Sequence, residues 1–162
     1  MPFQSRINRT LPVGVEGDFA STNPYHSLLN ASGGQYKAGA SGVIVGRFAW
    51  VDDATGLAVN AKGSLTRGGF VKRANTATVL TPGQEYSLTI RGGFEVELFD
   101  CGDFYARFAA GATSGQNVFA NDTTGVLVAN AGAALASHTI TPFKVVNTVL
   151  AGELAKITGW IK

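Results

Sequence analysis

The 21 glycines of this 162-residue chain lie between short apolar segments, and this spacing constrains the fold more than any other feature. Glycine adopts the backbone conformations that tight turns require, and it destabilises the interior of a helix. Several of the apolar segments alternate apolar with polar residues, which is the period of a strand with one buried face. We therefore expect an all-β fold, an antiparallel β-sandwich or small barrel that is jelly-roll-like.

The clearest alternation runs from Glu85 to Phe99, on either side of two adjacent glycines. A two-residue turn at these glycines would place Ile90 opposite Glu95 on one face, so a three-residue loop, Arg91–Gly93, gives the better register. A bend that carries one strand into a second sheet is the alternative. The loop register pairs Ile90 with Phe94, Leu88 with Val96 and Tyr86 with Leu98.

A second hairpin is predicted at the C-terminal end, where Phe143–Leu150 and Glu153–Ile161 flank Ala151 and Gly152. A two-residue loop gives a register in which apolar residues lie opposite one another on both faces. The pairs that it predicts are Val149 with Leu154, Phe143 with Trp160 and Val146 with Ile157.

Three other segments are also predicted to be strands. Val43–Val51 is apolar on both faces, as in a strand at the centre of a sandwich or barrel. Gly69–Arg73 and Phe104–Phe108 are shorter candidates. In the glycine- and alanine-rich stretch that follows, only Val126–Val128 is strongly strand-like, and residues 130–137 carry weak signals for a helical turn.

The chain is long enough for one compact domain with its own core. Its first 40 residues differ from the rest, because they hold three prolines and isolated apolar residues without a sustained period. Such a segment is either a loosely ordered terminus or an arm that becomes ordered against a partner. We therefore divide the chain into an extended N-terminal arm, residues 1–40, and a β-sandwich or barrel body, residues 41–162.

Composition excludes several classes of function. Only 15% of the residues are charged, against about 25% in typical soluble proteins, which fits a second surface buried against partners. The 13 basic residues are scattered and the net charge is +2, so direct binding of nucleic acid is not supported. The sequence lacks a signal peptide, a run of about 18 apolar residues and a second cysteine beside Cys101. We therefore expect synthesis in the cytoplasm and no membrane association.

The sequence contains no pattern typical of a catalytic or metal centre. His26 and His138 lie far apart, and neither has a second ligand at metal-binding spacing. Aspartates on either side of Cys101 would raise the pKa of its thiol, which argues against a nucleophile. We therefore predict no enzymatic activity, no cofactor and no metal. The densest acidic group, which lacks the spacing of a calcium loop, consists of Glu95, Glu97, Asp100 and Asp103.

Five segments carry a resemblance to a known family, and they follow one another along nearly the whole chain. They are Pro12–Ser21 with Asn23 and Pro24, Gly42–Trp50, Gly69–Arg73, Thr141–Val146 and Ala151–Ile157. They are similar to segments of the cement, or decoration, proteins of tailed-bacteriophage capsids. Residues 109–138 match nothing in that family.

The resemblance implies a structural protein on the exterior of the virion capsid. Such a protein bridges neighbouring subunits of the major capsid protein and forms a homo-oligomer, with a trimer favoured over a dimer. Deletion of residues 1–25 is then expected to leave the body folded and to weaken attachment to the capsid. The candidate contacts with capsid or sister subunits are the aromatic and basic residues Phe3, Arg6, Arg9, Phe19 and Tyr25.

Two other functions stay open. Another virion part, such as a tail, neck or fibre component, would share this composition. A small β-barrel that binds a ligand in its cavity, as a binding module or as an enzyme, belongs to a different class. An enzyme would need a pocket with convergent ionisable groups, and this requirement separates the two classes.

Overall fold

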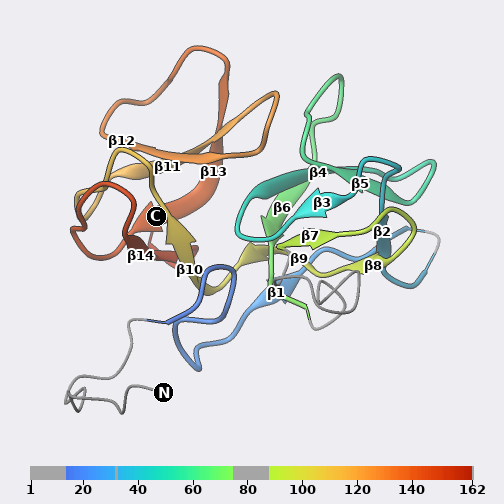
Figure 1. Ribbon diagram of the computed structural model, residues 1–162, viewed down its shortest axis with the longest axis horizontal. Helices are drawn as coiled ribbons and strands as arrows, with labels where there is room; N and C mark the ends of the chain where they lie inside the picture. The colour runs from blue at the N-terminus through green and yellow to red at the C-terminus, as the bar shows by residue number, and fades with distance from the viewer. Residues whose placement is uncertain (1–13, 32, 75–87, 162) are drawn as a thin grey trace, which may run out of the picture.

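The computed structural model describes residues 14–31, 33–74 and 88–161, and these residues form strands and turns without a helix (Figure 1). The prediction of an all-β fold is confirmed. A seven-stranded sheet and a five-stranded sheet form a sandwich, and a two-stranded ribbon accompanies the larger sheet. Neither sheet closes into a barrel.

The seven-stranded sheet lies on the right in Figure 1. Its neighbouring strands are antiparallel except for β2 and β5, which run parallel with Lys37 opposite Leu57. In spatial order the strands are β1 (His26–Ser27), β9 (Leu98–Cys101), β6 (Gly68–Val71), β4 (Phe48–Asp52), β5 (Leu57–Val59), β2 (Tyr36–Ala38) and β8 (Glu95–Val96).

The five-stranded sheet lies on the left in Figure 1 and is antiparallel throughout. Its strands are β10 (Asp103–Arg107), β14 (Leu154–Thr158), β13 (His138–Val145), β11 (Asn117–Asn121) and β12 (Leu127–Asn130). The ribbon consists of β3 (Val43–Ile44) and β7 (Thr89–Ile90).

Aromatic side chains from both sheets form the core between them. Phe70 of β6 lies 4.8 Å from Phe104 of β10 and 6.1 Å from Phe143 of β13, measured between ring centroids. All three side chains are fully buried. Fully burying one such side chain contributes on the order of 1.5–3 kcal/mol, so these contacts are a main reason for the packing of the two sheets.

The seven-stranded sheet also has a buried second face. Phe48 and Trp50 of β4 belong to the core between the sheets, whereas Ala49 and Val51 belong to a second cluster with the ribbon residue Val43. The prediction that the segment around β4 is buried on both faces is confirmed. The segment is not one strand, however, because Gly46 has φ +77° and separates β3 from β4.

The predicted hairpin register around Arg91–Gly93 is wrong, and the alternative, a bend between two sheets, is confirmed. Ile90 of β7 pairs with Val43, whereas Val96 of β8 pairs with Tyr36. A turn closed by a hydrogen bond from Phe94 N to Arg91 O directs the two strands into different sheets. The apolar alternation is compatible with any buried partner, so it predicted the strands but not their pairing. Tyr86, which belonged to the predicted register, lies outside the described residues.

The C-terminal hairpin is present as β13 and β14, but its predicted register is wrong by one residue. Val145, and not Val146, lies opposite Ile157. The side chain of Asn147 accepts a hydrogen bond from Lys156 N, so the chain leaves the ladder soon after β13 ends. Because a slip of one residue exchanges the faces of a strand, Val146 points to solvent and not into the core.

The shorter predictions have mixed outcomes. Gly69–Arg73 and Phe104–Phe108 correspond to β6 and β10, and Val126–Val128 overlaps β12. Residues 130–137, where a helical turn was considered, contain no helix: Asn130 ends β12, and bends and a turn follow before β13.

Parts of the segment that was assigned to the arm, residues 1–40, are strands of the seven-stranded sheet. β1 pairs with β9, and β2 lies between β5 and β8 with Tyr36 fully buried. The tyrosine and Ala38 supply one apolar face to the core, which a short alternating segment can do without a longer period. Residues 1–13 of the predicted arm lie outside the described residues.

Candidate interaction surface

Residues 17–20 lie along the outer edge of β10. Gly17 N donates a hydrogen bond to Tyr105 O, Tyr105 N donates to Asp18 O, and Ala20 N donates to Asp103 O, each at 2.9 Å. These bonds satisfy backbone groups that an edge strand would otherwise expose. The segment thereby prolongs the five-stranded sheet and positions residues 21–25 beside it.

Phe19 and Tyr25 are the two predicted contact residues that the structure describes, and they differ in exposure. The Phe19 ring stacks on Phe104 at 5.3 Å and packs against the core between the sheets. The Tyr25 ring lies 4.8 Å from Phe19, and the Tyr25 residue is 59% exposed. Phe19 therefore packs against the Tyr25 ring on its core side, and of these two residues Tyr25 is the more exposed. Phe3, Arg6 and Arg9 lie outside the described residues.

A pocket of about 280 Å³ lies beside these two rings. Lys72 reaches into it, with Nζ 5.1 Å from the Phe19 ring centroid and 2.7 Å from Glu97 Oε2. The ammonium group is thus already neutralised within the chain. The pocket is lined by Phe19, Tyr25, Ser27, Gln35, Lys72, Glu97 and Phe99.

A second hollow of about 380 Å³, which we call the Trp160 groove, lies beyond the end of β14. Trp160 is 51% exposed, and its Nε1 donates a 3.1 Å hydrogen bond to Pro24 O, the residue next to Tyr25. Val146 and Ile161 are also exposed in the groove. Its lining residues are Ala20, Ser21, Asn23, Asp103, Val146, Lys156, Ile157, Thr158, Trp160 and Ile161.

Sequence reasoning missed this groove. It placed Trp160 opposite Phe143 in the C-terminal hairpin and Val146 opposite Ile157, which would have given both side chains strand partners. The apolar character of the last residues was a visible signal, but the residues across the groove come from the opposite end of the chain.

The carboxyl group of Asp103 lies at the polar side of the groove. Burial raises its pKa, but the hydrogen bonds from Ser21, Thr158 and Asn23 outweigh burial and leave the pKa below its ordinary value. Ser21 Oγ and Asn23 Nδ2 both donate to Asp103 Oδ2 at 2.6 Å. The groove therefore combines an apolar wall with an ionised carboxylate.

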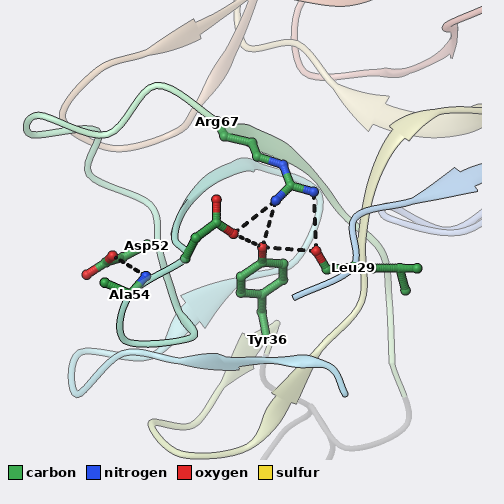
Figure 2. Close-up of polar contacts among 6 residues, drawn as sticks. Leu29, Tyr36, Asp52, Ala54 and Arg67 are labelled. Atoms are coloured by element: carbon green, nitrogen blue, oxygen red, sulfur yellow. Dashed lines mark hydrogen bonds and ion pairs between the residues drawn. The ribbon is translucent and has the colours of Figure 1, made fainter. Parts of the chain in front are cut away.

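A separate polar cluster joins the N-terminal segment to the seven-stranded sheet (Figure 2). The Tyr36 hydroxyl donates a short hydrogen bond to Asp53, and Arg67 Nη1 lies 2.9 Å from the same carboxylate. Arg67 Nη2 also donates to the carbonyl oxygen of Leu29 at 3.2 Å. The hydrogen bond from Tyr36, assisted by Arg67, holds the pKa of Asp53 below its ordinary value even though partial burial opposes this. The cluster fixes a turn to the sheet, which is a structural role.

Of the side chains that were weighed as chemical candidates, the structure brings His26 beside Asp100 and opposite Cys101, in the pairing of β1 with β9. His26 Nδ1 lies 2.6 Å from Asp100, whereas His138 lies at the start of β13. Burial raises the pKa of the Cys101 thiol, and Asp100 and Asp103 raise it further, in the direction expected from sequence. Within residues 14–31, 33–74 and 88–161, no three histidine, cysteine or acidic side chains could hold a metal ion together.

One family of known proteins matches almost the whole chain. The family model described as "XM1 gp53 minor capsid protein" matches residues 3–159. The chain belongs to this family. The match includes residues 109–138, for which sequence analysis found no resemblance and which contain β11 and β12.

A solved structure titled "The capsid of Myoviridae Phage XM1" contains a chain with the same fold. The TM-score is 0.59, the sequence identity is 16%, and the alignment covers 98% of each chain. No curated protein matches the sequence. The resemblance to capsid-associated phage proteins is thereby confirmed, and membership of a minor capsid protein family gives the chain a structural role in a phage capsid.

Proposed function

We propose that the protein is a capsid cement, or decoration, protein that binds the outside of a phage capsid and bridges subunits of the major capsid protein. Membership of a minor capsid protein family supports the capsid part of this proposal. The observation that supports the bridging role is the exposed ring of Tyr25, which lies where the N- and C-terminal segments meet.

This surface has the chemistry of a contact site. Tyrosine and tryptophan are enriched among the residues that dominate binding energy, because each provides a large, rigid area with a polar end. Here the Tyr25 ring packs against the rings of Phe19 and Phe99, at 4.8 and 5.5 Å between ring centroids. Because these contacts already restrict the Tyr25 side chain, little side-chain entropy is lost on binding. Nearby charges are already paired within the chain, such as Lys72 with Glu97.

The proposal includes a homo-oligomer, with a trimer favoured over a dimer, in which neighbouring copies attach to the capsid exterior together. Attachment at several sites makes detachment cooperative, so that individually modest contacts hold the protein on the shell. In the N-terminal arm, Phe3, Arg6 and Arg9 are proposed to contact the capsid surface or sister subunits. Nucleic acid and membranes are not among the proposed partners.

The test uses capsid shells of the matching phage that lack this protein. The purified protein is expected to bind them saturably and to raise the temperature at which they rupture, as measured by light scattering and release of packaged DNA. A protein that neither binds these shells nor changes their rupture temperature is not a cement protein. An unrelated phage's shells provide the control for non-specific adsorption.

The alternative assignment to a tail, neck or fibre component has less support, because the matching family is described by its place in a capsid. The alternative of a ligand-binding module has no specific observation in its favour.

A further inference from the structure

The Trp160 groove carries apolar side chains that the described part of the chain leaves exposed. Trp160, Ile161 and Val146 are each between 41% and 53% exposed, although they line one hollow. Contiguous exposed apolar surface with a polar side is typical of a site that binds a protein segment. The volume of about 380 Å³ is that of a few side chains and not of a globular partner.

The first 13 residues of the chain have the matching chemistry. They contain the apolar residues Phe3, Ile7 and Leu11, two arginines and no acidic residue. The two arginines account for the whole net charge, since the other 149 residues hold 11 basic and 11 acidic side chains. The groove offers apolar walls to the apolar residues of this segment, and its polar side carries the Asp103 carboxylate, which accepts hydrogen bonds from Ser21 and Asn23, together with Lys156.

The point at which this segment joins the described chain, Gly14, lies on the face that carries the groove. Gly14 lies so close to Tyr105 that a Cβ atom at this position would be 2.4 Å from the ring. Tyr105 is opposite Lys156 in the pairing of β10 with β14, and Lys156 lines the groove. Gly14, the first described residue, therefore lies on the same outer face of the five-stranded sheet as Lys156.

The groove of the same chain is poorly placed to receive this segment. The Tyr105 side chain contacts Gly14, and its ring centroid lies 6.0 Å from Lys156 Nζ, so it occupies the surface between Gly14 and the groove. A segment of 13 residues spans up to about 45 Å when extended, which is enough to reach a neighbouring molecule. Pro12 favours an extended backbone at Leu11, as an inserted strand-like segment requires.

We propose that residues 1–13 of a second copy of this chain occupy the Trp160 groove, so that copies exchange N-terminal segments around a symmetry axis. Leu11 and its apolar neighbours lie against Trp160, Ile161 and Val146, and an arginine approaches the Asp103 carboxylate. Each copy then both donates and receives one segment, which closes the assembly without an unfilled groove. This inference rests on the homo-oligomer in the proposed function, and it names the contact that forms it.

The test is a disulfide between two different molecules. Cys101→Ser removes the native thiol, and Leu11→Cys is then introduced into one protein and Val146→Cys into another. After mixing and mild oxidation, we expect a covalent dimer on a non-reducing gel. Leu150→Cys is the matched control, because Leu150 is an exposed apolar residue, at 75%, between β13 and β14 but does not line the groove.

Two results would overturn the proposal. One is a yield of dimer with Val146→Cys no higher than with Leu150→Cys. The other is closure of the disulfide within one chain when Leu11→Cys and Val146→Cys are combined in the same protein, seen as a faster-migrating monomer.

A second measurement needs no introduced cysteine. Trp50 is fully buried and Trp160 is half-exposed, so acrylamide quenches mainly Trp160. Deletion of residues 2–13 is expected to increase quenching and to reduce the mass measured by light scattering; unchanged quenching and mass contradict the proposal. Binding of the full chain to capsid shells is measured in parallel. If shells are still bound but no exchange is found, only this inference fails, whereas exchange without shell binding refutes the cement function alone.

Discussion

Trp160 and Pro24, which are 136 positions apart in the sequence, are joined by a 3.1 Å hydrogen bond from the indole Nε1 to the proline carbonyl oxygen. This bond connects the segment after β14 to the segment before β1. It also fixes the position of the exposed tryptophan relative to Tyr25, and so determines the shape of the proposed contact surface.

Substitution Trp160→Phe removes the hydrogen bond and keeps an aromatic ring in the groove. We expect the free energy of unfolding to fall by about 0.5–1.5 kcal/mol, the usual contribution of one hydrogen bond, since the Pro24 carbonyl regains water. Urea denaturation followed by circular dichroism measures this. An unchanged midpoint with an unchanged slope would show that the bond adds nothing to stability.

Position 125 requires glycine for two reasons, its backbone angle and the atoms that surround it. Its φ is +67°, and a Cβ atom would be 2.1 Å from the carbonyl oxygen of Phe48, in the strand at the centre of the larger sheet. Gly125→Ala is therefore expected to cost more than the roughly 1–2 kcal/mol of left-handed backbone alone.

Gly115→Ala is the matched control. Its φ is +87°, but no atom lies within 4 Å of the added Cβ. We expect a loss of about 1–2 kcal/mol for this variant, from the backbone alone. If thermal unfolding shows equal losses of stability for Gly125→Ala and Gly115→Ala, the contact with Phe48 does not contribute to the need for glycine at position 125.

The ionisation of Asp53 makes the free energy of unfolding depend on pH in the acid range. Its pKa is below the ordinary value of 3.8, mainly because the Tyr36 hydroxyl donates to the carboxylate. A lowered pKa means that the native state binds fewer protons than the unfolded state, so the contribution is present above pH 3.8 and is lost as pH falls through the lower native pKa. Asp53→Asn is expected to reduce the slope of stability against pH below pH 3.8, measured by urea denaturation. A variant with the full wild-type slope would show that other carboxylates cause it.

The location of Phe19 changes what deletion of the N-terminal segment should do. Phe19 packs on Phe104 in the core between the sheets, and residues 17–20 bond to the edge of β10. Deletion of residues 1–25 is therefore expected to destabilise the body, by about 1–3 kcal/mol from the lost contacts of the partly buried phenylalanine. Deletion of residues 2–13, the control, leaves these contacts in place and should leave the thermal midpoint of an isolated monomer unchanged.

How much of this fold the sequence predicts depends on whether the deciding interaction is local. Alternation predicted β10, because a strand with one buried face needs only its own pattern. It failed to pair Ile90 and Val96 correctly, since both faces of the larger sheet are buried and several partners satisfy the same pattern. The C-terminal register differs by one residue from the predicted one, and a hydrogen bond from Lys156 N to the Asn147 side chain, which the apolar pattern does not encode, accompanies this shift.

For the candidate site, too, a residue could be predicted from sequence only where local features were enough to select it. The aromatic character of Tyr25 was enough to select it, because an isolated aromatic residue in a low-charge segment is a recognisable anchor. The groove was not predictable, because its walls come from residues 20–23, β10 and the last residues of the chain. The fold alone brings these segments together.

The proposed contact role of Tyr25 can be separated from its part in the fold. Tyr25→Ala removes a ring that is mainly exposed, so we expect a loss of about 2 kcal/mol or more in binding to capsid shells, roughly 30-fold in affinity. Leu29→Ala is the control, because Leu29 is 67% exposed and contributes its backbone carbonyl, and not its side chain, to the Tyr36 cluster. Its affinity for shells should stay within about twofold of the wild type. Sedimentation of labelled protein with shells gives both affinities, and circular dichroism confirms that each variant is folded. If Tyr25→Ala binds as tightly as Leu29→Ala, the bridging surface lies elsewhere, since a contact centred on this ring cannot survive its removal.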